Sequence, residues 1–134
     1  SVPSAATQRE ALSAATRGHD VVVVDLPRVA DAVVEETVLR CDLVILLVRA
    51  TVASVAATAR LAARLPDRGR LGLVTRGSGV DPDDLASLTG VRLLDAMGDQ
   101  RRLTESVDLG LGPAPGRRGP LVRAAARVLA EAGS

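Results

Sequence analysis

Two uninterrupted apolar runs constrain the fold of this chain more than any other feature of the sequence. The first is four valines at residues 21–24, and the second is Leu-Val-Ile-Leu-Leu-Val at residues 43–48. Both runs are far shorter than the roughly twenty residues that a membrane-spanning helix needs. Short runs without polar alternation are typical of strands that are buried on both faces, as in a parallel sheet covered by helices.

Segments with helical spacing alternate with these predicted strands. Strands are predicted at residues 21–24, 43–48, 71–75 and 91–94, and helices at residues 7–16, 32–40, 52–65, 82–88, 100–107 and 120–132. The predicted N-caps are Asp31, Thr51, Asp81 and Asp99, and the glycines predicted just past helix ends are Gly18 and Gly90. The order predicts one α/β domain over residues 1–134, with three layers and a mostly parallel sheet flanked by helices. Ligands of such sheets bind at the carboxyl ends of the strands.

The amino-acid composition excludes several kinds of chemistry. The chain has no Phe, Trp, Tyr, Lys or Asn, and all 17 of its cationic side chains are Arg, a bias that a GC-rich genome explains. Without Lys there is no Schiff base, no phospho-receiver lysine and no lysine of a phosphate-binding loop. Without aromatic residues there is no platform for stacking bases, and the net charge of +1 gives no support to nucleic-acid binding.

The single cysteine and the single histidine also limit the possible sites. Cys41 has no partner for an internal disulfide, and together with His19 it cannot form a usual zinc site. A buried, inert thiol is the favoured interpretation of Cys41, and a surface or turn position that of His19. We expect a cytoplasmic protein without a transmembrane segment.

Asp25 directly follows the four valines and is the most informative acidic residue. An apolar strand that ends in an acid is typical of a Walker B motif, because such a position holds a carboxylate rigidly beside phosphates and Mg²⁺. An aspartate that only caps the next turn explains the same pattern. Arg28, Arg49 and Arg76 are candidates to converge on an anion at the strand ends, with solvated arginines as the alternative. The Gly-rich loop at residues 76–79 is a weak candidate for an anion cradle.

Four stretches, taken in order, carry a resemblance to a known family. They read HDVVVVDLPR at residues 19–28, EETVLRCDLVILLV at 35–48, LVTRG at 73–77 and ESVDLG at 105–110. Together they resemble the C-terminal half of MinD/ParA-type P-loop ATPases. Within that group the chain is most similar to the actinobacterial CpaE-like proteins, also called septum-site-determining (Ssd) proteins and linked to TadZ-type pilus-assembly factors.

The resemblance implies specific roles and an ATP and Mg²⁺ requirement for the full-length protein. Asp25 would hold Mg²⁺ through water, and Pro27 would belong to the switch that senses the γ-phosphate. Thr75 and Arg76 would take the place of the family's adenine contact. Val29 stands where MinD-like members have a glycine, so the backbone freedom of that position is lost.

The phosphate-binding loop and its lysine belong to the N-terminal half of the family and have no counterpart here. The resemblance therefore implies that the chain is the C-terminal half of a larger ATPase domain, without catalytic residues of its own and not hydrolytic alone. The strand before that loop would normally lie between the strands at residues 21–24 and 43–48. Its absence would leave a gap, unless these two strands pair directly in a smaller four-stranded sheet.

The functional expectation follows from this resemblance. The full-length protein would position a pilus, secretion or cell-division apparatus, as a homodimer and with protein partners from that apparatus. The alternative is a degenerate, non-catalytic α/β domain that acts as a scaffold. The basic, amphipathic helix at residues 120–132 is expected to pack on the sheet; binding to a membrane surface is the less favoured interpretation, because its stripe lacks bulky anchors.

Overall fold

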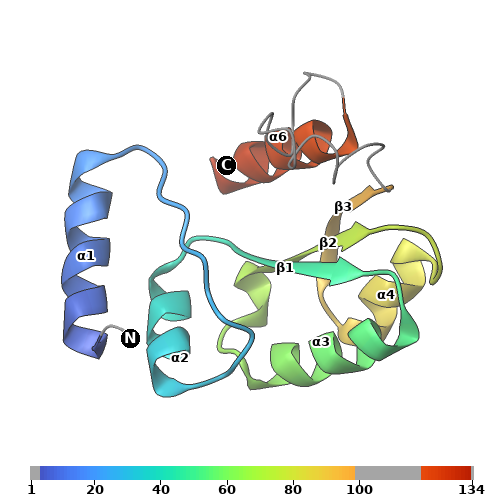
Figure 1. Ribbon diagram of the computed structural model, residues 1–134, viewed down its shortest axis with the longest axis horizontal. Coiled ribbons are helices and arrows are strands. Elements are labelled where there is room, and N and C mark those ends of the chain that lie inside the picture. The colour runs from blue at the N-terminus through green and yellow to red at the C-terminus, as the bar shows by residue number, and fades with distance from the viewer. Residues whose placement is uncertain (1–3, 99–118, 134) are drawn as a thin grey trace, which may run out of the picture.

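The computed structural model describes residues 4–98 and 119–133 of the chain. Within these residues three strands form one parallel sheet in the order β1-β2-β3 (Figure 1). The strands are β1 (Val44–Arg49), β2 (Leu71–Arg76) and β3 (Arg92–Met97). The helices are α1 (Ala5–Gly18), α2 (Ala32–Arg40), α3 (Val52–Arg64), α4 (Pro82–Thr89) and α6 (Pro120–Ala132), and a short 3-10 turn, η1 (Arg68–Arg70), precedes β2. The predicted helix at residues 100–107, with its cap Asp99, lies outside the described residues.

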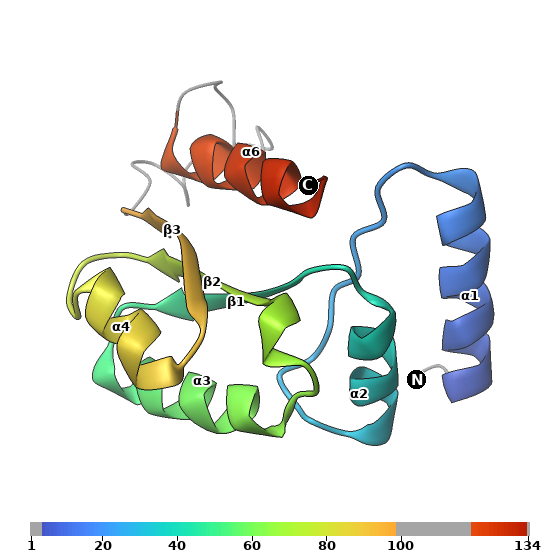
Figure 2. The ribbon, with the colours of Figure 1, turned by 180° about the vertical axis from the view of Figure 1, so that it is seen from behind.

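Helices cover both faces of the sheet, so the predicted three-layer α/β architecture is confirmed. Helices α3 and α4 lie on one side and α6 on the other, as both views show (Figures 1 and 2). One apolar cluster joins α2, α3 and α4 to the sheet, and a second lies between the sheet and α6. Each strand therefore has an apolar layer above and below it, which is the environment that continuous apolar runs indicate.

Strand β2 lies at the centre of the sheet and is buried along its length from Leu71 to Thr75. Its partner on one side is β1, with Val44 opposite Leu71 and Arg49 opposite Arg76. On the other side it pairs with β3, where Leu94 lies over Gly72. A Cβ atom on Gly72 would come within 2.3 Å of Leu94 Cδ1. The glycine therefore provides the space that the Leu94 side chain occupies.

Most helix signals lie where they were predicted, because they act within a few residues; the exception is Gly18, predicted just past a helix end, which is the last residue of α1. Helices α2, α3 and α4 start after the predicted caps, and Gly90 ends α4 in the left-handed conformation with φ of 70°. The capping side chains of Asp31, Thr51 and Asp81 accept hydrogen bonds from the amides of Val34, Ser54 and Asp83. Asp83 and Asp84 occupy the first turn of α4, where their negative charges complement the helix dipole.

The strand predicted at residues 21–24 is wrong. Residues 20–30 adopt no regular secondary structure and make no backbone–backbone hydrogen bond with the described part of the chain. The sheet therefore has three described strands, β1 is at its edge, and the direct pairing expected of a closed four-stranded sheet is not formed. The physical reason is that a strand exists only with a hydrogen-bonded neighbour, and no neighbour lies beside this segment.

Burial still alternates along this valine segment, as we call residues 21–24. Val21 and Val23 are exposed, at 57% and 87%, whereas Val22 and Val24 are half-buried. Alternation with a period of two residues is that of an extended chain with one side against a core. The segment thus has the side-chain pattern of a strand without its hydrogen bonds.

Helix α1 is attached less firmly than the other helices. It buries none of its residues and lies beside α2 (Figure 2). Polar contacts join it to α2: Arg9 Nε lies 2.5 Å from Glu36 Oε1, and Gln8 Nε2 donates to Thr37 Oγ1 at 3.4 Å. The ion pair is largely exposed, and exposed ion pairs contribute little stability.

Helix α6 has the predicted bounds and packs against β3, in agreement with the favoured interpretation. On this helix Ala124 is buried, whereas Ala125 and Leu129 are exposed. Arg92 Nη2 on β3 lies 2.6 Å from Glu131 Oε1 on α6. In the part of the chain that the structure describes, no helix is both long enough and apolar enough to cross a membrane.

Candidate functional site

Two arginines lie side by side at the carboxyl ends of β1 and β2. Arg49 and Arg76 are register partners on neighbouring parallel strands, so their side chains leave the same face of the sheet. Neither forms an ion pair with an acidic side chain among residues 4–98 and 119–133. Like charges on facing positions destabilise a sheet unless solvent or an anion compensates them. This edge is therefore suited to an anionic ligand.

A third guanidinium group reaches the same end of β1 from the segment before α2. Arg28 Nη2 donates a short hydrogen bond to the backbone carbonyl of Leu47, two residues before Arg49. Arg28 thus lies at the outer edge of β1, near the carboxyl end of the strand, whereas Arg49 and Arg76 are neighbours across β1 and β2. Arg is well suited to this position because its planar fork binds carboxylate and phosphate groups through two hydrogen bonds.

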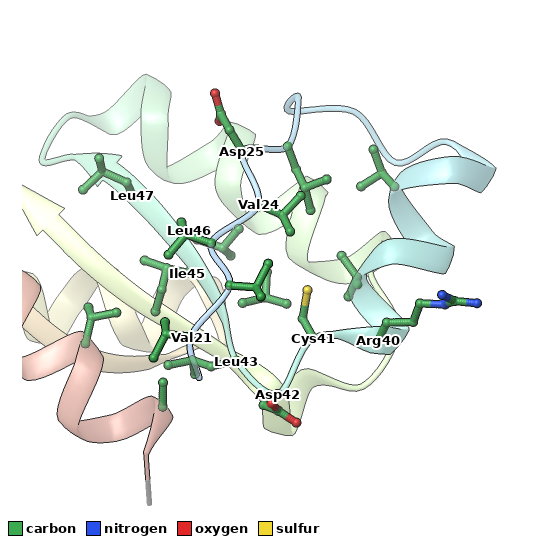
Figure 3. Close-up of a pocket in the computed structure, with 18 of the residues that line it drawn as sticks. Val21, Val24, Asp25, Arg40, Cys41, Asp42, Leu43, Ile45, Leu46 and Leu47 are labelled. Atoms are coloured by element: carbon green, nitrogen blue, oxygen red, sulfur yellow. The ribbon is translucent and has the colours of Figure 1, made fainter. Parts of the chain in front are cut away.

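Asp25 and Pro27 lie on the outer side of β1, along a cavity of about 760 Å³. We call this space the β1 cavity; residues 19–28 and 40–48 both contribute to its lining. Figure 3 shows the side chains of Val21 and Val24 grouped with those of Leu43, Ile45 and Leu46, whereas Asp25 points away from this apolar group. The Asp25 side chain is exposed and free to meet a ligand.

Thr75 and Arg76, the other two predicted cofactor contacts, lie on β2 and do not line the β1 cavity. Arg76 is half-buried, but Thr75 is only 1% exposed. A ligand at the sheet edge therefore reaches Arg76 without a rearrangement, whereas the Thr75 hydroxyl lies inside the fold. The structure places the four predicted contact residues in two groups, one on each side of β1.

The side chains present suit a magnesium ion only in one particular way. No group of three or more His, Cys, Asp or Glu side chains that could hold a metal occurs in the described ranges. Asp25 would thus be one carboxylate beside an ion whose other ligands are water and phosphate. Mg²⁺ accepts such an arrangement because it keeps several of its waters and binds through one or two carboxylates.

The glycine loop after β2 forms a turn in preference to an anion cradle. Gly77 has φ of 84°, and its N–H donates to the Met97 carbonyl at 3.0 Å, so this amide is not free for a ligand. Gly79 lies against the end of β1, where a Cβ atom would come within 2.3 Å of Ala50 O. Both glycines therefore serve the close approach of backbone segments.

Cys41 lies half-buried in the wall of the β1 cavity and has the properties of an inert thiol. Its Sγ–H donates to the Thr37 carbonyl at 3.3 Å. Burial, with a smaller contribution from the Asp42 charge, raises the pKa of the thiol above its ordinary value of 9.0, although Arg70 acts in the opposite direction. A raised pKa keeps the sulfur protonated at neutral pH and slows its reactions as a nucleophile.

His19 and Arg70 have structural roles beside the cavity. His19 is exposed, as predicted, and its Nδ1–H donates to the Ala15 carbonyl at the end of α1 at 3.0 Å. Arg70 Nη1 donates to the carbonyls of Leu39 and Cys41, and its Nε lies 2.8 Å from Asp67 Oδ2. The role of Arg70 was not predicted, because the carbonyls of Leu39 and Cys41 belong to residues about thirty positions before it in the sequence.

Comparisons with known proteins give relatives but no family. No family model matches the sequence, and no solved structure matches it. Two proteins of Mycobacterium tuberculosis, described as uncharacterized proteins MT3760 (strain CDC 1551 / Oshkosh) and Rv3660c (strain ATCC 25618 / H37Rv), are each 38% identical over 122 residues. The match covers 88% of this chain and 35% of each relative, so the chain spans about a third of the length of the curated relatives that it matches.

Proposed function

We propose that this chain is the C-terminal part of a CpaE/MinD-like ATPase, a P-loop NTPase that acts in positioning a pilus, secretion or cell-division apparatus. The observation that carries the proposal is the pair of arginines, Arg49 and Arg76, without acidic partners in the described ranges. They lie at the carboxyl edge of a parallel sheet, where such folds bind ligands. The choice of a nucleotide as the anion rests on the resemblance of the sequence motifs.

The roles within this site follow from where each side chain lies. Arg76 would contact the base or the phosphates of the nucleotide, with Arg49 beside it on the same face. Asp25, exposed on the other side of β1, would hold the magnesium ion through water. Magnesium would supply the neutralisation of phosphate charge, whereas this chain would bind and orient the nucleotide and would not hydrolyse it alone.

Binding of a non-hydrolysable ATP analogue to the full-length protein tests this proposal. We expect Arg76→Ala to weaken binding about tenfold or more, since a charge-assisted hydrogen bond contributes about 1.5–3 kcal/mol. Asp25→Asn should weaken binding in the presence of Mg²⁺ and leave the weaker, Mg²⁺-free binding unchanged. Arg60→Ala, at an exposed position on α3, is the matched control and should leave binding unchanged. Equal affinities for all three variants would contradict the proposed nucleotide site.

The second candidate is a non-catalytic scaffold domain, and the burial of Thr75 favours it. A contact residue that is 1% exposed cannot touch a nucleotide in this conformation. Val29 at the glycine position of the switch points in the same direction. If the full-length protein binds no ATP analogue with or without Mg²⁺, the scaffold explanation holds.

A further inference from the structure

The first part of the chain is not joined to either apolar cluster of the fold. Residues 4–24, which we call the N-terminal arm, contain no member of the two clusters that join the helices to the sheet. Among the described residues, Leu26 is the first that packs against one of them. Burial of apolar side chains is the main source of stability in a folded chain. The arm therefore shares little of the stability of the sheet and its helices.

The contacts of the arm with α2 include groups that water can reach. Besides the Arg9–Glu36 ion pair and the hydrogen bond of Gln8, Arg40 Nη1 on α2 donates to Ser13 Oγ on α1 at 3.4 Å. The side chains of Arg9 and Glu36 are 50% and 37% exposed, so water and salt compete with their interaction. Part of the attachment of the arm therefore depends on charge and is weakened by salt.

The residues that follow the arm are fixed to the fold, whereas the second half of the arm is not. Residues 20–30 have no regular secondary structure and no backbone–backbone hydrogen bond within the described ranges. Beyond the arm, Leu26 packs against the core, Arg28 donates to the Leu47 carbonyl on β1, and α2 then begins after its cap. The arm can therefore turn about residues 25–26 without breaking a backbone–backbone hydrogen bond of the described chain.

The arm forms one wall of the β1 cavity. Leu12 and Thr16 on α1 and residues 19–24 after it contribute to the lining. The chain at residues 41–48, with Cys41 at its start, lines the same cavity on the side of β1. A movement of the arm away from β1 would therefore open the cavity to solvent, and Cys41 would stay behind on the remaining wall.

We propose that the N-terminal arm is a lid on the β1 cavity, which moves away from α2 and β1 while the sheet and its other helices stay folded. The Arg9–Glu36 ion pair holds the lid closed. Elements that have few buried apolar contacts open at a much lower free energy than the core does. The open form gives solvent and ligands access to the apolar wall of the cavity and to Cys41. Opening of the lid requires no nucleotide.

The labelling rate of Cys41, the only cysteine of the chain, tests the proposal. The reagent is dithiodipyridine, a neutral disulfide, and each rate is divided by that of the same variant unfolded in urea. We expect the folded parent chain to react about tenfold or more slower than the unfolded chain. This rate should change little in low urea, because opening of the lid exposes little surface. Amide exchange in the buried strand β2 is the reference for the urea dependence of core unfolding.

Variants of the ion pair test what holds the lid closed. Arg9→Gln should speed the labelling about two- to fivefold, as expected for an exposed ion pair, and should lower amide protection in α1 by the same factor. Arg9→Glu alone should also speed it, and Arg9→Glu combined with Glu36→Arg should restore the parent rate. Arg17→Gln is the matched control, because it removes the same charge from α1 where no ion pair forms within the described residues. It should leave the rate unchanged.

Three results would overturn the proposal. Labelling with the urea dependence of β2 amide exchange would mean that reagent reaches Cys41 only when the core unfolds. Labelling of the folded parent as fast as that of the unfolded chain would mean that the arm does not cover the thiol. Equal rates for Arg9→Gln, Arg17→Gln and the parent would mean that the ion pair does not hold the arm. None of these measurements involves a nucleotide, so they are decided independently of the proposed ATP site.

Discussion

Strand β2 and the valine segment are apolar stretches of similar length, but they differ in pairing and in burial. Four β-branched residues make the valine segment the stronger strand former, whereas β2 contains a glycine at its second position. Nevertheless β2 is paired on both sides and buried, and the valine segment is unpaired and Val23 is 87% exposed. The difference teaches that neighbours determine whether such a stretch is a strand, and intrinsic preference does not.

The largest difference between the two stretches is expected on truncation of a core side chain. Leu73→Ala in β2 should lower the free energy of unfolding by about 2–5 kcal/mol, because Leu73 is fully buried. Val23→Ala in the valine segment should change it by about 0.5 kcal/mol or less. Urea denaturation of both variants of the 134-residue chain provides the measurement. A comparable loss at Val23 would show that the segment is packed in solution.

The glycines of the two regions should also differ. Gly72→Ala places a methyl group against Leu94 and should destabilise the chain by about 1–3 kcal/mol. Gly18→Ala, at the end of α1, has no atom within 4 Å of the new Cβ and should cost nothing. Thermal unfolding of the two variants, read by circular dichroism, compares them. If Gly72→Ala is as stable as the parent, the Leu94 side chain can adopt another conformation without loss of stability.

Helix caps test the same contrast between packed and loosely attached parts. Asp31→Ala removes the cap of α2, which contributes Val34 and Val38 to the core, and should cost about 0.5–2 kcal/mol. Ser4→Ala removes the cap of α1, which buries no residue, and should fray that helix with less than about 0.5 kcal/mol of global effect. Urea midpoints, with amide exchange in α1, distinguish the two outcomes. Equal losses would mean that α1 unfolds together with the core.

The smallest expected effect is the pH dependence that comes from Cys41. Its pKa is raised in the folded chain, so the thiol binds its proton more tightly there than in the unfolded chain. The resulting stabilisation is fully present below a pH of about 9.0, and it is lost as the pH rises through the pKa of the thiol in the folded chain. Unfolding free energies measured across this alkaline range should fall less for Cys41→Ser than for the parent chain. Parallel curves for the two proteins would place the thiol in water.

Local signals made most of the helices predictable. The caps Asp31, Thr51 and Asp81 and the terminal Gly90 act within a few residues of themselves, and each was in its predicted place. The packing faces of the helices are harder to predict. On α3 the buried stripe contains Thr58, whereas the apolar Ala63 is exposed. A polar threonine gave no apolar signal, although its position three residues after Val55 fits the stripe.

The sheet and the candidate site were less predictable, because both depend on which strands become neighbours. The side-by-side position of Arg49 and Arg76 follows from the register of β1 and β2, which the sequence of neither strand determines alone. The valine segment illustrates the same limit: its sequence indicates a strand, but pairing requires a partner that residues 20–30 do not find in the described ranges. A glycine inside a strand, such as Gly72, is a usual sign of a close approach. The sequence does not indicate that Leu94 is the residue that approaches it.

The unpaired outer edge of β1 also has a consequence for handling the chain. An open edge with apolar side chains is a template for edge-to-edge aggregation. Within the described residues, Ile45 directs both its N–H and its C=O to this edge without a backbone partner. Arg28, by occupying the Leu47 carbonyl, covers one acceptor and places a positive charge against a second molecule that approaches there. We therefore expect the Arg28→Ala variant to aggregate more than the parent chain at high concentration and low salt.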